Sequence, residues 1–160
     1  MKNRCFLASV FHFVNIHFKN KKMINQLSNL NWIAVLAAFF AYFVLGALWF
    51  TLFFKKQYAI SLGKLNQLPQ KPAPIFIIGP AICSLIITVT SAILIYALGI
   101  TTYPQAIEFA FIIGFGYLVA NTINIAINPN MPNPIYYGII SGAYHLVGIF
   151  IVSIIIFTMK

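Results

Sequence analysis

Residues 32–54 read WIAVLAAFFAYFVLGALWFTLFF, a continuous apolar run without a charged side chain. As an α-helix the run would extend roughly 35 Å, at about 1.5 Å per residue, and the hydrocarbon core of a bilayer is about 30 Å thick. Trp32 stands at its start and aromatic residues cluster at its end, which is where membrane helices place rings beside the lipid headgroups. The run is therefore predicted to be a transmembrane helix.

Three further runs of similar length follow, at residues 75–98, 106–127 and 135–158. Prolines fall mainly between the runs, where a residue without an N–H suits a helix start or a loop, and only Pro80 lies inside one. Lipid cannot satisfy free backbone groups, so each run is expected to be a continuous helix. The sequence thus predicts an all-α fold, a four-helix transmembrane bundle over residues 23–160.

The composition agrees with this prediction. Hydrophobic residues make up 61% of the chain and charged residues 7%, whereas a soluble domain has roughly 25% charged residues. Ten Lys or Arg and one acidic residue give a net charge of +9, and the basic residues lie outside the apolar runs. This placement is typical of loops that face anionic lipid. The predicted partner is the lipid bilayer, and no nucleic acid is expected because no compact basic face or motif is present.

Residues 1–22 form a basic N-terminal extension. Their apolar stretch, residues 5–16, is too short to span a bilayer, and no small-x-small cleavage site follows it. Two interpretations remain. The extension is an interfacial segment, or Met23 is the natural start and the extension is not part of the natural protein.

The orientation depends on that choice. With four spans, both termini share one side with the loop between the second and third runs. Counted from Met1, that side carries six basic residues and the opposite side four; counted from Met23, the numbers are one and four. The second count, which we favour, places residues 55–74 in the cytoplasm and both termini outside.

Several motifs resemble those of a known family. They are Asn31-Trp32-Ile33-Ala34-Val35-Leu36, Gly46-Ala47-Leu48-Trp49-Phe50 with its exit at Lys55-Lys56, and Gly142-Ala143-Tyr144-His145-Leu146-Val147. Over residues 23–160 the chain resembles the bacterial integral membrane family called domain of unknown function 1761. It departs from the family pattern at Phe50-Thr51-Leu52, where a Tyr-Ser-Pro-like turn is usual. The resemblance implies a multi-pass, four-helix protein of the bacterial plasma (inner) membrane and supplies no catalytic residues.

Two stripes of polar or small residues lie inside the third and fourth runs. In the third run Tyr117, Asn121 and Asn124 follow helical spacing and would share one face, which Gly114 and Asn128 extend. In the fourth run the stripe consists of Gly138, Ser141, Gly142, His145 and Gly148. Because the two runs are joined by a short turn, matched depth would pair Tyr117 with His145 and Asn121 with Ser141.

The stripes have two interpretations. In the first they are packing surfaces, with close approach at the glycines and interhelical hydrogen bonds worth ~0.6 kcal/mol on average. In the second they line a polar cavity for a substrate or a proton, in which His145 would titrate near neutral pH. The candidate polar cluster is Tyr117, Asn121, Asn124, Ser141 and His145, and the packing positions are Gly138, Gly142 and Gly148.

Residue types that support catalysis are scarce. Glu108 is the only acidic residue, so the chain has no pair of carboxylates and no Asp for a Ser-His-Asp triad. The two cysteines form no C-x-x-C pair, and the other histidines lie outside the spans, so no metal site and no cofactor are predicted. Glu108 itself is interpreted as an interfacial charge near a helix N-terminus, with a proton or cation carrier as the alternative.

These observations favour a non-enzymatic membrane protein, an assembly or accessory subunit. The first alternative is a small transporter or channel subunit with a polar intramembrane site around His145. The second alternative, a membrane enzyme, has the least support in the sequence. A homo-oligomer or a membrane-protein partner fits the first two hypotheses, since four helices enclose little space alone.

Overall fold

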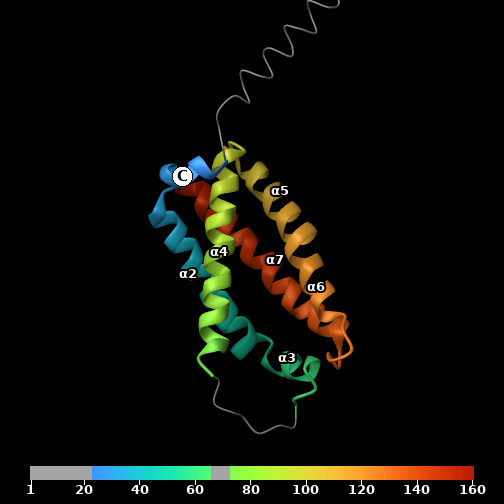
Figure 1. Ribbon diagram of the computed structural model, residues 1–160. Coiled ribbons are helices and arrows are strands. Elements are labelled where there is room, and N and C mark those ends of the chain that lie inside the picture. The colour runs from blue at the N-terminus through green and yellow to red at the C-terminus, as the bar shows by residue number, and fades with distance from the viewer. Residues whose placement is uncertain (1–22, 66–72) are drawn as a thin grey trace, which may run out of the picture.

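The computed structural model describes residues 23–65 and 73–160 (Figure 1). In chain order the elements are the 3-10 helix η1 (Met23–Asn29), α2 (Trp32–Leu48), the π-helix η2 (Trp49–Phe53), α3 (Lys55–Ser61), α4 (Ile75–Ala97), α5 (Tyr103–Ile113), the π-helix η3 (Gly114–Val119), α6 (Ala120–Ala126) and α7 (Pro134–Thr158). No strand occurs in these two ranges. The expectations for the extension at residues 1–22 fall outside them.

Four helical stretches of the described chain are long and apolar enough to cross a membrane. The first span joins α2 and η2 (Trp32–Phe53), the second is α4, the third joins α5, η3 and α6 (Tyr103–Ala126), and the fourth is α7. The predicted all-α, four-helix transmembrane bundle is confirmed. The third span begins before the predicted residue 106, because the Thr102 hydroxyl accepts a hydrogen bond from the Gln105 N–H and Pro104 occupies the first turn.

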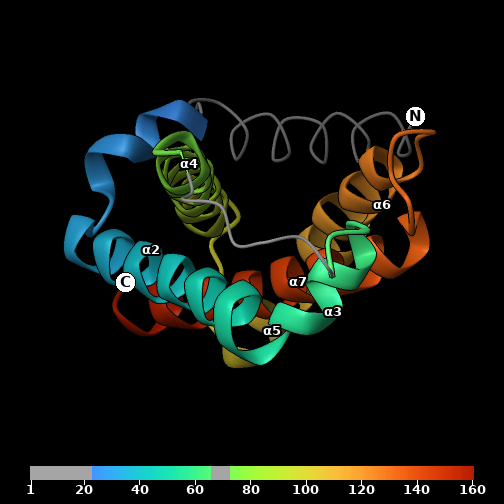
Figure 2. The same ribbon diagram turned by 90° about the horizontal axis from the view of Figure 1, so that it is seen from below.

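α7 is the centre of the bundle and contacts α2, α4 and every segment of the third span. α4 packs on α2, α7 and η1. In the view along the bundle, α4 and α6 lie on the same side of the layer that α2 and α7 form, with a gap between them (Figure 2). The second and third spans are therefore held together chiefly through α7.

The π-helix η3 decides which side of the third span meets α7. A π-helix forms i→i+5 hydrogen bonds, so each of its turns holds about one residue more than an α-helical turn. The buried positions Ala106, Ala110, Gly114 and Ala126 are separated by multiples of four. In a regular α-helix each step of four would rotate this row by about 40°. The wider turn offsets that drift and keeps one row of small residues buried.

The first span also ends in a π-helix, and it remains helical through Phe50-Thr51-Leu52. The chain then bends at Phe54 into the short α3. The Asn133 side chain donates to the Ile60 carbonyl at 2.9 Å and fastens α3 to the start of α7. Burial raises the pKa of Tyr58 on α3 to about 12, with the neighbouring Tyr137 as a further cause.

Asn31 ties three helices together at the opposite end of the bundle. Its side-chain oxygen accepts from the N–H groups of Ile33 and Ala34, which caps α2. Its side-chain NH₂ donates to the Met159 carbonyl at 2.7 Å, and its backbone N–H donates to the Tyr96 hydroxyl at 3.2 Å. One residue thus joins α2 to the ends of α4 and α7.

Replacing Asn31 with alanine is expected to lower the free energy of unfolding by about 1–2 kcal/mol, because the cap and the bond to α7 are lost together. Thermal unfolding of the purified protein in detergent measures the change. Asn25→Ala is the matched control, since Asn25 is exposed and its side chain makes no hydrogen bond to the described residues. Equal melting temperatures for the two variants would contradict the assignment of Asn31 as a structural tie.

Candidate functional site

The polar centre of the bundle is a tyrosine–histidine pair between the first and fourth spans. Tyr42 is 0% exposed and lies on the buried face of α2 with Ala34 and Ala38, each four residues from the next. Its hydroxyl oxygen is 2.6 Å from Nδ1 of His145. When Nδ1 is unprotonated, the Tyr42 O–H donates to it and the ring proton resides on Nε2. The pair joins the first span to the fourth by a hydrogen bond inside the apolar core.

Aromatic rings and glycines surround this pair. The ring centroid of Tyr144 is 5.2 Å from that of Tyr42 and 4.7 Å from that of His145. Gly46 on α2 gives Tyr144 its space, because a Cβ at that position would lie 2.9 Å from the Tyr144 hydroxyl. On α7, a Cβ at Gly148 would overlap the ring of Tyr42. The two glycines therefore admit one large ring from each opposite helix.

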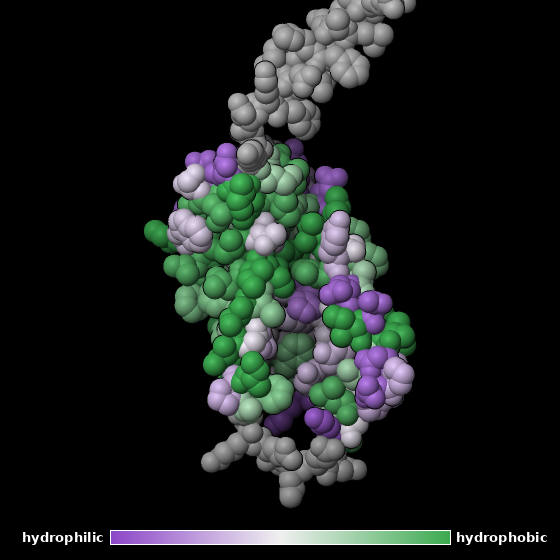
Figure 3. Space-filling model, in the orientation of Figure 1, coloured by the Kyte–Doolittle hydropathy of each residue, from purple (hydrophilic) through white to green (hydrophobic). Residues whose placement is uncertain are grey.

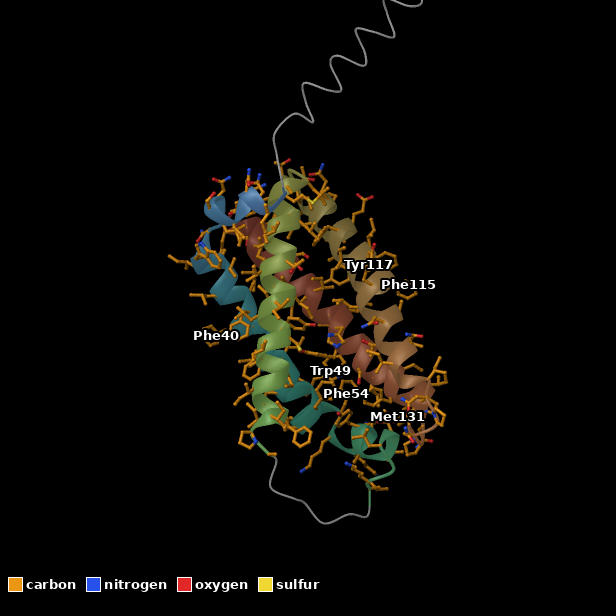
Figure 4. All side chains as sticks on the ribbon, in the orientation of Figure 1. Phe40, Trp49, Phe54, Phe115, Tyr117 and Met131 are labelled. Carbon is orange, nitrogen blue, oxygen red and sulfur yellow. The ribbon has the colours of Figure 1, made fainter. Side chains whose placement is uncertain are left out.

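Trp49 makes a second connection between the first and fourth spans. Its indole N–H donates to the Ile140 carbonyl at 3.1 Å, and its ring lies 4.5 Å from that of Phe54. In the view of Figure 4, Trp49 and Phe54 are seen through the gap between α4 and α6, whereas Phe40 points outward from α2. Gly46 and Trp49, which carry the family resemblance in the first run, thus both face α7.

Two other glycines of α7 meet the third span. A Cβ at Gly142 would lie 3.3 Å from a methyl group of Val119, and one at Gly138 would lie 3.2 Å from Ile123. These contacts are tighter than ordinary van der Waals distances. The third and fourth spans therefore approach closely at two of the small positions that the sequence singles out.

The side of the third span that faces α7 differs from the predicted stripe. Tyr117 is 69% exposed, and Asn121 and Asn124 are exposed as well. Gly114, which was expected to extend their face, is buried against Leu146 and Ile149 of α7. The π-helix places Gly114 and the polar residues on different sides of the span, since its wide turn rotates the residues after Gly114 relative to those before it.

The expected pairs across the two spans are therefore not formed. His145 bonds to Tyr42 instead of Tyr117. The Ser141 hydroxyl is buried and has no hydrogen-bond partner among the described residues, so it does not meet Asn121. The predicted cluster is divided, with His145 and Ser141 inside the bundle and the third-span residues on its surface.

Tyr42 is the residue that the sequence reasoning missed. It stands among phenylalanines in an apolar run, where a tyrosine resembles any other large core residue. A usable signal was its spacing of four from Ala38 and Gly46, which places it on the small-residue side of the first run. A hydroxyl on a packing face needs a partner in lipid, and His145 was the available acceptor.

A groove of about 630 Å³ lies between the second half of α4 and the start of the third span. Most of its lining is apolar, but Thr90, Gln105, Glu108 and Tyr117 also face it. Farther along, the surface is hollowed between α4 and α6 (Figure 3). The gap between the second and third spans is thus an open, mostly apolar surface with a few polar groups.

His145 and Glu108 lie in different parts of the bundle, His145 beside Tyr42 and Glu108 at the groove. Residues 23–65 and 73–160 contain no cluster of three His, Cys, Asp or Glu side chains that could hold a metal ion. His145 has the Tyr42 hydroxyl as its hydrogen-bond partner, and Glu108 has no hydrogen bond or ion pair with a described residue. The Tyr42–His145 pair stabilises packing, and the groove offers space for an apolar group.

Comparison with known proteins gives one match. Residues 33–157 match the model of a family described as "Protein of unknown function (DUF1761)". No curated protein and no solved structure matches the chain.

Proposed function

We propose that this chain, which belongs to the DUF1761 family, is a non-enzymatic subunit of a membrane assembly in which the third spans of two copies pack together. The observation that supports the proposal is the exposed polar surface of Tyr117, Asn121 and Asn124 on a membrane-spanning helix. We call these three residues the polar face. Such side chains are rare on a lipid-facing surface because they lack partners there.

The polar face lies deep within the third span. Along the helix axis Tyr117 lies about 4 Å and Asn121 about 10 Å from the midpoint of the third span, at about 1.5 Å per residue. Both positions fall within the roughly 15 Å half-thickness of the hydrocarbon core. Neither side chain makes a hydrogen bond to the described part of the chain. A partner that supplies hydrogen-bonding groups would remove the cost of leaving them in lipid.

A second copy of this chain fits the polar face for two reasons. The carboxamide of Asn121 carries both a donor and an acceptor, so two copies related by a two-fold axis can exchange a reciprocal pair of hydrogen bonds. The two asparagines of the face also lie three residues apart in the regular helix α6, beyond the π-helix, so they point to the same side of the helix. A polar residue at the contact between two helices fixes the register of the pair.

The proposal is tested by energy transfer between two fluorescent copies in phosphatidylcholine vesicles, with the lipid-to-protein ratio varied. We expect concentration-dependent transfer, and we expect Asn121→Leu to weaken association about sevenfold. The estimate takes two symmetric hydrogen bonds at ~0.6 kcal/mol each, and 1.4 kcal/mol corresponds to tenfold.

Asn130→Leu is the matched control, because Asn130 is exposed in the turn outside the spans and its side chain makes no hydrogen bond to the described residues. That variant should associate like the unchanged protein. A protein that stays monomeric at every lipid dilution, or an Asn121→Leu variant that associates normally, would refute the proposal.

We also propose that the assembly resides in the bacterial plasma membrane, with α3 on the cytoplasmic side. Lys55, Lys56 and Lys64 lie in or just after α3, and Lys160 lies at the opposite end of the bundle. Excess positive charge in short loops marks the cytoplasmic side. Lys64→Cys, in a protein whose Cys5 and Cys83 are replaced with serine, should stay unlabelled by a membrane-impermeant thiol reagent in intact cells. Labelling of position 64 from outside would reverse the orientation.

A further inference from the structure

The groove between α4 and the third span holds Glu108, the only acidic side chain in a sequence that has ten basic residues. Glu108 lies about 10 Å from the midpoint of the third span, on the side of the midpoint opposite Asn121, so its Cα is inside the half-thickness of the hydrocarbon core. It forms no ion pair with any described residue. A counter-charge would stabilise an ionised carboxylate in this environment, and the surrounding leucine and isoleucine side chains supply none.

Lys160 contacts one lining residue, Ile100, but is not itself among the residues that line the groove. The ammonium of Lys160 donates to the Ile100 carbonyl at 3.2 Å and lies 4.9 Å from the centroid of the Tyr96 ring. Of the other polar groups at the groove, the Gln105 side chain accepts from the Thr101 N–H. Glu108 is the one charged side chain among the residues that line the groove, so the lining itself attracts a cation.

The remaining walls indicate what kind of cation fits. Phe109 and the exposed ring of Tyr117 line the groove beside aliphatic side chains. Aromatic faces attract cations, most strongly where water is excluded. A volume of about 630 Å³ is in the range of sites for small organic molecules. The lining thus combines an anion, aromatic rings and apolar walls.

We propose that this groove binds a hydrophobic organic cation, which enters laterally from the bilayer and pairs with the carboxylate of Glu108. The site goes beyond the proposed assembly role. It shares Tyr117 with the polar face, whereas Glu108 lies outside that face, so the effect of Glu108→Gln on cation binding can be distinguished from a failure of the copies to associate. The positive centre of the ligand lies near Glu108, and its apolar body extends along the groove between α4 and the third span toward the ring of Tyr117.

Tetraphenylphosphonium and tetraphenylborate are suitable probes, since they have the same shape and opposite charges. Binding of each ion to the full-length protein is measured by equilibrium dialysis in phosphatidylcholine nanodiscs, with empty nanodiscs subtracted. We expect saturable binding of the cation and no saturable binding of the anion. Equal binding of both ions would mean partition into lipid and would overturn the proposal.

Substitutions at the groove give a second readout. Glu108→Gln should weaken cation binding by at least about tenfold, since it removes the charge and keeps the shape. Glu108→Asp should retain most of the affinity, which separates loss of charge from loss of fold. Tyr117→Leu should weaken binding about threefold or more, while Tyr136→Leu, an exposed tyrosine away from the groove, should leave it unchanged. Unchanged affinity in a folded Glu108→Gln protein would refute the site.

Discussion

Replacing Gly148 with leucine is expected to prevent the bundle from folding stably. A Cβ at this position already overlaps the ring of Tyr42, and that ring is fully buried against α7. Overpacking a core costs about 1–3 kcal/mol and occasionally more. Here the added side chain would meet a large ring held between two helices, so we expect the free energy of unfolding to fall by more than ~3 kcal/mol. The total free energy of unfolding of a protein is only about 5–15 kcal/mol.

The yield of monodisperse protein and its unfolding in a denaturing detergent measure this effect. Gly116→Leu is the matched control, because Gly116 is exposed and has no atom within 4 Å of the Cβ it would gain. The control should behave like the unchanged protein. If the steric conflict with Tyr42 is the cause, adding Tyr42→Ala to the Gly148→Leu protein should recover part of the lost stability. A stable Gly148→Leu protein would show that α2 and α7 do not pack as described.

Tyr42→Ala alone should destabilise the bundle by about 3–5 kcal/mol, since it removes a fully buried ring and leaves a cavity between the first and fourth spans. Tyr42→Phe should cost less, about 0.6–2 kcal/mol, because the ring remains and only the hydrogen bond to His145 is lost. The difference between the free energies of unfolding of the two variants separates the contribution of packing from that of the hydrogen bond.

A double-mutant cycle with His145→Leu isolates the hydrogen bond itself. If the 2.6 Å contact stabilises the fold, Tyr42→Phe and His145→Leu should show a coupling energy of about 0.6–1.7 kcal/mol. Phe40→Leu is a control for loss of an aromatic ring. Because Phe40 is exposed, this substitution should change the free energy of unfolding little. Strictly additive effects of Tyr42→Phe and His145→Leu would mean that the pair contributes nothing beyond its packing.

The number, class and approximate limits of the spans could be predicted from the sequence because they depend on the length and hydropathy of the apolar runs and on the prolines between them. The side that each span presents to its neighbours was harder to predict. In the third span the prediction assumed 3.6 residues per turn, and the π-helix at Gly114–Val119 breaks that assumption. The position of a π-helix depends on packing, here of Gly114 against Leu146 and Ile149, which no local pattern reveals.

The candidate site shows the same limit. His145 and the small residues of α7 could be singled out because they are unusual within an apolar run. Their partners were harder to identify, because a tyrosine or a tryptophan is common in a membrane helix, and the spacing of Tyr42 from Ala38 and Gly46 indicates its face but not its partner. Glu108 was noticed as the only acidic residue, but the groove that it faces depends on the separation of α4 from the third span. Such tertiary spacing is not encoded in the composition of any one helix.

The hydrogen bonds of Asn31 and Trp49 have a consequence for how this fold can change during evolution. Both side chains donate to main-chain carbonyls, those of Met159 and Ile140. Every amino acid supplies the same carbonyl, so the acceptor positions can accumulate substitutions without losing the bond. Selection therefore acts on one partner of each contact only. Correlated substitution between the two positions, the usual statistical trace of spatial proximity, will not arise from either bond.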